Sequence, residues 1–346
     1  MTETSKFVAT ADPYVGRRRW LAPVVGLLLT FVAWAALSFG AVAVPLEEVF
    51  GVLARKVGLS LFAEPSPQAE AVVWSIRMPR LLLGFAVGAA LALVGGMLQG
   101  LLRNSLADPH LLGIGPGAAI GAAIGSAAGG VQGAIAGGVA AGVVTSFVIR
   151  RLARRASIDP TRIILSGVAL GAALSAWVGF VVFGSDRARV PPIEFWLLGS
   201  LTGSTWRAFW TALILVLIGG VVMFSSARLL DVFALGEADA RHLGIDVDLV
   251  RTVLLIAAGA AVGATVGAVG VIAFVGLLIP FLLRRFTGPL HRHLLWAALA
   301  WGALFVAAAD LVARLAFEPI EIPVGLVTAA VGGPVFLWLL TRRQDV

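Results

Sequence analysis

The chain has 346 residues, of which 59% are hydrophobic and only 13% are charged, and its mean hydropathy is +0.97. A water-soluble protein cannot bury so much apolar surface, so the composition indicates a helical protein that crosses a membrane several times. The absence of cysteine excludes disulfides and thiolate metal sites. The net charge of +7 is better explained by loops that face anionic lipid than by binding to nucleic acid.

The sequence offers no site for ATP. Its only lysines are Lys6 and Lys56, and neither follows a glycine, so no Gly-Lys-Ser/Thr phosphate loop is present. If the protein uses ATP, then ATP and Mg are bound by a partner chain.

The apolar segments follow one another along the whole chain. Residues 1–19 form a polar tail ending in Arg17-Arg18-Arg19, and the run 20–44 is too long for the core of a cleaved signal, so it is expected to be the first span. Further apolar segments lie near 81–102, 111–128, 131–149, 163–183, 205–224, 252–283, 294–316 and 324–341.

The longest of these segments is expected to contain a break. As one helix, residues 252–283 would measure about 48 Å against a bilayer core of about 30 Å, so we expect a break near Gly267–Gly270. Gly129-Gly130 similarly separates the third and fourth spans. The sequence therefore predicts an all-α polytopic membrane protein with about ten transmembrane helices, in a single domain over residues 20–343.

The distribution of basic residues predicts the orientation. With ten spans and a cytoplasmic N-terminus, 18 of the 26 lysines and arginines fall in cytoplasmic loops. Both termini are then cytoplasmic. The outer side carries two longer connections, an amphipathic one at 45–80 and one at 184–204 that contains Pro191-Pro192. The second is read either as a helix at the outer mouth or as an interfacial anchor.

A charged island, residues 235–245, interrupts the apolar sequence on the cytoplasmic side. It has acids early (Glu237, Asp239) and bases late (Arg241, His242), an order that complements the dipole of a short helix. Glu237 and Arg241 are four residues apart in the favourable orientation, and Gly244 is a typical helix stop. The island is either a compact helix to which another protein binds or a solvated loop between two spans.

Seven sequence blocks, in order and at plausible spacing, resemble those of one family. They lie at 77–80 (Arg-Met-Pro-Arg), 88–99, 103–117, 270–280, 309–314, 321–328 (Glu-Ile-Pro-Val-Gly-Leu-Val-Thr) and 332–336. Together they resemble the FecCD-type permeases of bacterial ABC importers for iron-siderophores, haem and cobalamin, over roughly residues 45–343.

The resemblance implies a type II ABC importer permease in the bacterial cytoplasmic membrane. Its partners would be a second permease subunit, identical or related, two cytoplasmic ATPases and an extracytoplasmic substrate-binding protein. The island would be the coupling helix that docks on the ATPase, so the resemblance favours a helix to which another protein binds over a solvated loop. The residues expected to serve in coupling are Gly236, Glu237, Ala240, Arg241, Leu243 and Gly244.

The resemblance also suggests roles for three arginines on the outer side. In such permeases, arginines at the positions of Arg77, Arg80 and Arg314 face acidic residues of the binding protein, and the planar guanidinium suits paired contacts with carboxylates. The alternative for Arg77 and Arg80 is interfacial snorkelling. The alternative for Arg314 is an intrahelical pair with Asp310, which lies deep enough to need a partner.

The sequence gives only a weak indication of the residues that line the transport pathway. Small and weakly polar residues of the fifth and tenth spans are candidates to line it, with Ser166, Ser175 and Thr328 as the hydroxyl-bearing members, although small residues also serve tight helix packing. Two features depart from the expected pattern. Phe281 stands where relatives usually carry His, and His291-Arg-His293 lacks the further ligands that a metal site needs.

The favoured interpretation is the permease subunit of a ferric siderophore importer, because that branch of the family is the most populated. Haem and cobalamin are the alternatives within the class. An ion-coupled secondary transporter would need several intramembrane acids, whereas the spans contain only Asp310. An intramembrane enzyme would need a catalytic constellation that the spans do not show.

Overall fold

The computed structural model describes residues 14–59, 64–155, 160–184, 197–318 and 320–342, and all of the regular structure in these ranges is helical. The first part of the chain comprises α1 (Val15–Ser38), α2 (Leu46–Lys56), α3 (Pro67–Glu70), η1 (Ala71–Arg77), α4 (Met78–Leu101), α5 (Ile114–Arg155) and α6 (Pro160–Gly184). The second part comprises α8 (Trp206–Ser225), α9 (Ala227–Leu235), α10 (Glu237–His242), α11 (Val247–Val269), α12 (Val275–Thr287), α13 (His291–Leu315) and α14 (Val324–Arg342).

Six helical segments of the described residues are long and apolar enough to cross a membrane, and shorter apolar helices lie within α6 and α14. The expected all-helical, multi-span architecture is confirmed. Of the two outer connections, α2, α3 and η1 occupy the first, whereas residues 185–196 of the second lie outside the described residues, as do residues 1–13 of the polar tail.

Both expected breaks are present. The helix α5 is interrupted at Gly129 and Gly130, whose backbone angles are not helical, so it doubles back as two antiparallel segments. The helix α11 ends at Val269, and α12 begins only at Val275, after Gly270 and Phe274 have adopted positive φ angles of 74° and 67°. The second break is therefore somewhat longer and later than expected.

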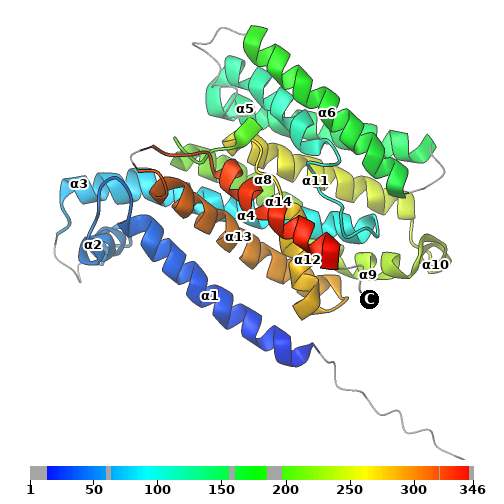
Figure 1. Cartoon of the computed structure of the whole chain (residues 1–346), viewed down its shortest axis with the longest axis horizontal. Helices are drawn as coiled ribbons and strands as arrows, with labels where there is room; N and C mark the ends of the chain where they lie inside the picture. The colour runs from blue at the N-terminus through cyan, green and yellow to red at the C-terminus, as the bar shows by residue number, and fades with distance from the viewer. Residues whose placement is uncertain (1–13, 60–63, 156–159, 185–196, 319, 343–346) are drawn as a thin grey trace, which may run out of the picture.

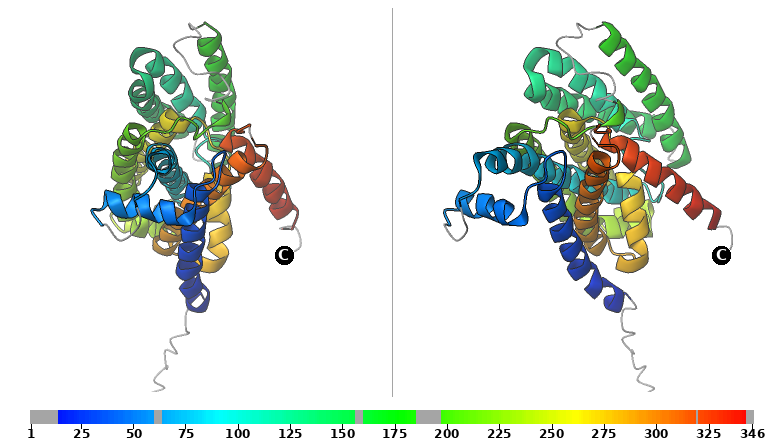
Figure 2. Two further views of the ribbon diagram at one scale, coloured as in Figure 1. Left: turned by 90° about the vertical axis from the view of Figure 1, so that its left-hand side faces the viewer. Right: turned by 60° about the vertical axis from the view of Figure 1, so that its left-hand side comes forward.

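The helix α4 lies at the centre of the bundle (Figure 1), and nearly all of its residues are buried. It packs against α13, α12, α8 and α11, while α5 packs chiefly against α11 and α6. The helices α6 and α1 lie at opposite edges of the molecule (Figure 2). The starts of α1 and α13, the end of α12 and the short helix α10 all lie toward the end of the bundle opposite α2 and α3 (Figure 1). This common end is the one that the basic residues predict to be cytoplasmic.

Glycines allow α4 to approach its neighbouring helices so closely that their backbones are in contact. A Cβ added to Gly88 would lie 2.1 Å from the carbonyl oxygen of Gly302 in α13, and one added to Gly95 would lie 1.9 Å from that of Gly276 in α12. Gln99 adds a polar link to α12, because its amide donates to the carbonyl of Leu277 at 3.1 Å. Such small-residue contacts stabilise membrane helices, for which burial away from water provides little driving force within the bilayer.

We predict that Gly88→Val destabilises the protein by about 3 kcal/mol, because the new side chain has to push α13 away from α4. The matched control is Gly26→Val in α1, where an added Cβ would meet nothing within 4 Å. The measurement is the fraction of monodisperse protein left after heating in detergent. Equal losses for the two variants would contradict the close-approach interpretation.

Candidate functional site

The charged island forms the short helix α10, as predicted. Gly236, with φ of 137°, separates α10 from α9, and Gly244, with φ of 80°, ends the turn that follows it. These two glycines allow the chain to turn sharply on both sides of a six-residue helix. Glu237 and Asp239 lie in its first turn, and Arg241 and His242 lie in its last.

The helix α10 has one buried face and one exposed face. Ala240 is completely buried, whereas Arg241 is exposed and Leu243 is 64% exposed. Leu235, at the end of α9, is 68% exposed as well. Two exposed leucines beside a charged helix form a surface that a partner protein can cover.

An ion pair with α11 holds the island against the bundle. The spacing of the residues within the island does not predict this pair. The expected pair of Glu237 with Arg241 is present but long, at 3.6 Å. The main partner of Glu237 is Arg251 in α11, with which it forms a direct hydrogen-bonded ion pair. Because Arg251 is fourteen residues away and in another helix, i to i+4 reasoning cannot find it.

A second connection leads to α13 from α9, the helix that precedes the island. Asp231 of α9 accepts hydrogen bonds from the backbone N–H of His291 at 2.7 Å and from its Nδ1 at 2.8 Å. The imidazole is almost completely buried beside Gly100 of α4. His291 thus joins α9 to α13, and the described residues contain no group of three potential ligands that would make His291-Arg-His293 a metal site.

The three outer arginines are buried, each with a relative exposure of 7% or less. Arg80 forms a bidentate ion pair with Asp310. The two distances are 2.8 Å from Nη2 to Oδ1 and 3.0 Å from Nε to Oδ2. Arg314 lies 3.5 Å from the same carboxylate, so the suggested intrahelical pair is present as the weaker of the two. The pair of Arg80 with Asp310 joins residues 230 positions apart, a separation at which no local spacing rule applies.

Backbone carbonyls and one further acid complete this outer cluster. Arg77 donates to the carbonyls of Leu37 and Val42, at the end of α1 and just beyond it. Arg80 Nη1 also lies 2.8 Å from Glu321, which accepts a second hydrogen bond from Thr202. Burial alone would raise the pKa of Glu321, but the hydrogen bond and charge of Arg80 outweigh it and lower the pKa. Glu321 therefore stays ionised at neutral pH.

The pathway candidates occupy different environments. Ser166 is exposed and Ser175 is partly exposed on α6, whose outward face also carries the exposed Trp177 and Phe180. Thr328, by contrast, is completely buried in α14, and its hydroxyl donates to the carbonyl of Gly325 at 3.0 Å. The structure therefore does not bring the three hydroxyls together within one chain.

Comparisons with known proteins agree on one family. The model of the FecCD transport family matches residues 28–342. The cobalamin import system permease BtuC of Halobacterium salinarum is 40% identical over 80% of this chain and 75% of its own length. The vitamin B12 import system permease BtuC of Vibrio cholerae is 37% identical over 86% of this chain and 91% of its own.

Solved structures show the same architecture. An inward-facing structure described as a putative metal-chelate type ABC transporter superimposes with a TM-score of 0.79, covers 94% of this chain and 99% of its own, and is 29% identical. The PsaBC protein of Streptococcus pneumoniae, solved with a Fab, has a TM-score of 0.54 at 16% identity, which indicates a shared fold alone.

We predict that Asp310→Asn destabilises the protein by on the order of 3 kcal/mol, because it leaves the buried guanidinium of Arg80 without its main countercharge. The matched control is Arg55→Ala, which breaks a pair with Glu64 whose side chains are 54% and 80% exposed and which should change stability by less than about 1 kcal/mol. The check is the apparent melting temperature of the purified protein. Indistinguishable melting temperatures for D310N and the unsubstituted protein would show that the cluster contributes little.

Proposed function

The chain belongs to the FecCD transport family, and we propose that the compound it transports is cobalamin or a closely related corrinoid. Membership makes it the permease of an ABC importer, a multi-pass membrane protein without catalytic function of its own. The sequence alone favours a ferric siderophore. The observation that supports cobalamin instead is the identity of 37% to 40% with two cobalamin permeases over most of the chain.

We further propose that the permease works with a second permease subunit, two ATPases that bind ATP and Mg, and an outer binding protein. The exposed surface of α10 and of Leu243, which follows it, supports this segment as the part that contacts an ATPase. The exposed apolar face of α6, with Ser166, Ser175 and Trp177, supports contact with the second permease across a shared pathway. Thr328 is a weaker candidate for that pathway because it is buried within its own chain.

The docking role of Arg77, Arg80 and Arg314 stays a prediction. Their guanidinium groups already form hydrogen bonds or ion pairs within the chain. Contact with a binding protein therefore requires them to break their interactions with backbone carbonyls or with Asp310. Glu321, whose side chain is 40% exposed, is the member of the cluster that already reaches the surface.

The substrate is tested by reconstituting the permease with its ATPase and binding protein in liposomes that contain ATP. We expect ATP-dependent accumulation of labelled cyanocobalamin, and no comparable accumulation of a ferric hydroxamate or of haem. Liposomes loaded with ADP provide the control. Accumulation of the ferric hydroxamate without cobalamin would replace the proposed substrate while leaving the family assignment intact.

We expect the triple substitution E237A/R241A/L243D to uncouple ATP hydrolysis from transport, because it removes both the link to Arg251 and the exposed apolar contact of the α10 segment. Transport should fall at least about tenfold, which corresponds to a loss of about 1.4 kcal/mol in coupling. Leu152→Asp, at the exposed cytoplasmic end of α5, is the control for an added acid. Unchanged substrate-stimulated hydrolysis and transport in the triple variant would remove α10 from the coupling path.

A further inference from the structure

The first turn of α13 is capped by a side chain from another helix. Its N-cap residue is Leu290, which has no polar side chain to accept a hydrogen bond. Asp231 of α9 accepts instead, and its Oδ1 lies 2.7 Å from the backbone nitrogen of His291 and 2.8 Å from Nδ1 of the same residue. The first N–H groups of a helix have no partner within the helix, so a carboxylate placed there stabilises its N-terminus. Asp231 therefore fixes α9 to the start of α13.

The imidazole of His291 is held on three sides. A carboxylate only accepts hydrogen bonds, so Nδ1 carries the hydrogen that Asp231 receives. On the other side, Nε2 lies 3.5 Å from Nη2 of Arg284 in α12, and because a guanidinium only donates, Nε2 is the unprotonated nitrogen. The ring also lies against Gly100 of α4, where an added Cβ would be 2.3 Å from Nε2. A ring held in this way transmits a displacement of its partner, because it has no room to rotate.

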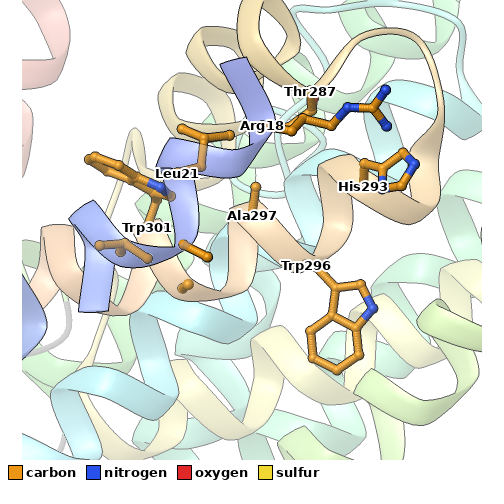
Figure 3. Close-up of a pocket in the computed structure, with 10 residues that line it drawn as sticks. Arg18, Leu21, Thr287, His293, Trp296, Ala297 and Trp301 are labelled. Atoms are coloured by element: carbon orange, nitrogen blue, oxygen red, sulfur yellow. The ribbon is translucent and has the colours of Figure 1, made fainter. Parts of the chain in front are cut away.

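The opposite face of α13 is loosely packed. A cavity of about 330 Å³ lies between α13 and α1, and Figure 3 shows Leu21 of α1 and Ala297 of α13 among its lining residues. Successive residues of an α-helix are turned by about 100°, so the residues of α13 that line the cavity face away from His291. They are His293, Trp296, Ala297, Ala300 and Trp301. On the face of His291, by contrast, Leu294 and Ala298 are completely buried. The first half of α13 is therefore held on one face and has room to move on the other.

The middle of α13 is in backbone contact with α4. A Cβ added to Gly302 would lie 2.3 Å from the carbonyl oxygen of Gly88, so the two helices cannot slide past each other freely at this point. The helix α13 runs from His291 to Leu315 without a proline or a break. A continuous helix that is held at its middle moves as one body, so a displacement at its first turn shifts its other half in the opposite direction.

We propose that the contact of Asp231 with His291 transmits movement of α9 and α10 to α13, which then tilts about its contact with α4. The helices α9 and α10 are separated only by Gly236. A displacement of α10 therefore reaches α11 through the chain and through Arg251, and it reaches α13 through Asp231. Asp231 and His291 are positioning residues, because they act on a helix and not on the transported compound.

This inference rests on the proposed contact of α10 with an ATPase, and it does not depend on which compound the permease carries. The tilt of α13 carries its first half into the space beside α1, where no side chain fills the cavity. The same tilt moves Asp310, in the other half of α13, relative to Arg80 of α4. The Asp231–His291 contact thereby connects the segment around α10 with the outer ion cluster.

The test measures distances between spin labels in the reconstituted importer complex, since the chain has no cysteine of its own. The pair R292C/L152C places labels at exposed positions of α13 and α5, and the pair L249C/L152C reports on α11, which follows α10 in the chain. Double electron–electron resonance compares the nucleotide-free complex with the complex trapped by ATP and vanadate. We expect both distances to change by about 2 Å or more, the size of a typical helix shift in a switching protein.

Asp231→Ala should abolish the change on α13 and preserve the change on α11, because it removes both hydrogen bonds to His291 and leaves the pair of Glu237 with Arg251 in place. Asp231→Asn keeps an acceptor oxygen and should restore the change on α13. A second arm leaves Asp231 untouched. Gly100→Ala displaces the imidazole and should also abolish the change on α13, whereas Gly96→Ala, whose Cβ would come no closer than 3.3 Å to a neighbour, should preserve it.

The two label pairs separate failure of this inference from failure of the proposed function. A change on α13 that persists in D231A or in G100A would overturn the role of the Asp231–His291 contact, as would a change that D231N does not restore or that G96A also abolishes. Movement of α11 without movement of α13 in the unsubstituted complex would overturn it too, while supporting the contact of α10 with the ATPase. If neither pair responds to nucleotide, the proposed role of α10 fails, and this inference fails with it.

Discussion

The close approach of α4 to α13 is the constraint on which the rest of the structure depends. The two helices run antiparallel, and the backbone of Gly88 touches that of Gly302 near the middle of the contact. In a bilayer, moving an apolar side chain from lipid to protein gains little, so tight packing of this kind has to provide much of the cohesion. The same register brings Arg80 at the outer end of α4 directly against Asp310 near the outer end of α13.

The register has a matching consequence at the opposite end of the helix pair. Gly100 lies against the ring of His291, and any side chain at that glycine would collide with the imidazole, whose Nε2 is 2.3 Å from the position of an added Cβ. His291 in turn is held by Asp231 of α9, the helix that precedes α10. One helix pair therefore places the outer ion cluster at one end and the junction with the island at the other.

Local patterns in the sequence were sufficient to predict the features that depend on neighbouring residues. The break after Val269, the turn at Gly129 and the polarity of α10 all follow from length, glycine and charge order. The partners of Arg80 and Glu237 did not follow, because an ion pair between distant helices depends on which helices pack and in which register. No property of residues 77–80 alone predicts that Asp310, 230 positions after Arg80, is the partner of that arginine.

The burial of the outer arginines illustrates the same limit with a different consequence. The family motif suggests that these side chains face outward, yet in this conformation all three contribute to cohesion between α1, η1, α4 and α13. A buried arginine is costly unless its charge and donors are satisfied, and here Asp310, Glu321 and backbone carbonyls satisfy them. Any partner that recruits Arg80 from outside has to offer at least as good a set of acceptors. Such a partner would also loosen the outer end of the α4–α13 pair, whose inner end is joined through His291 to the segment that precedes α10.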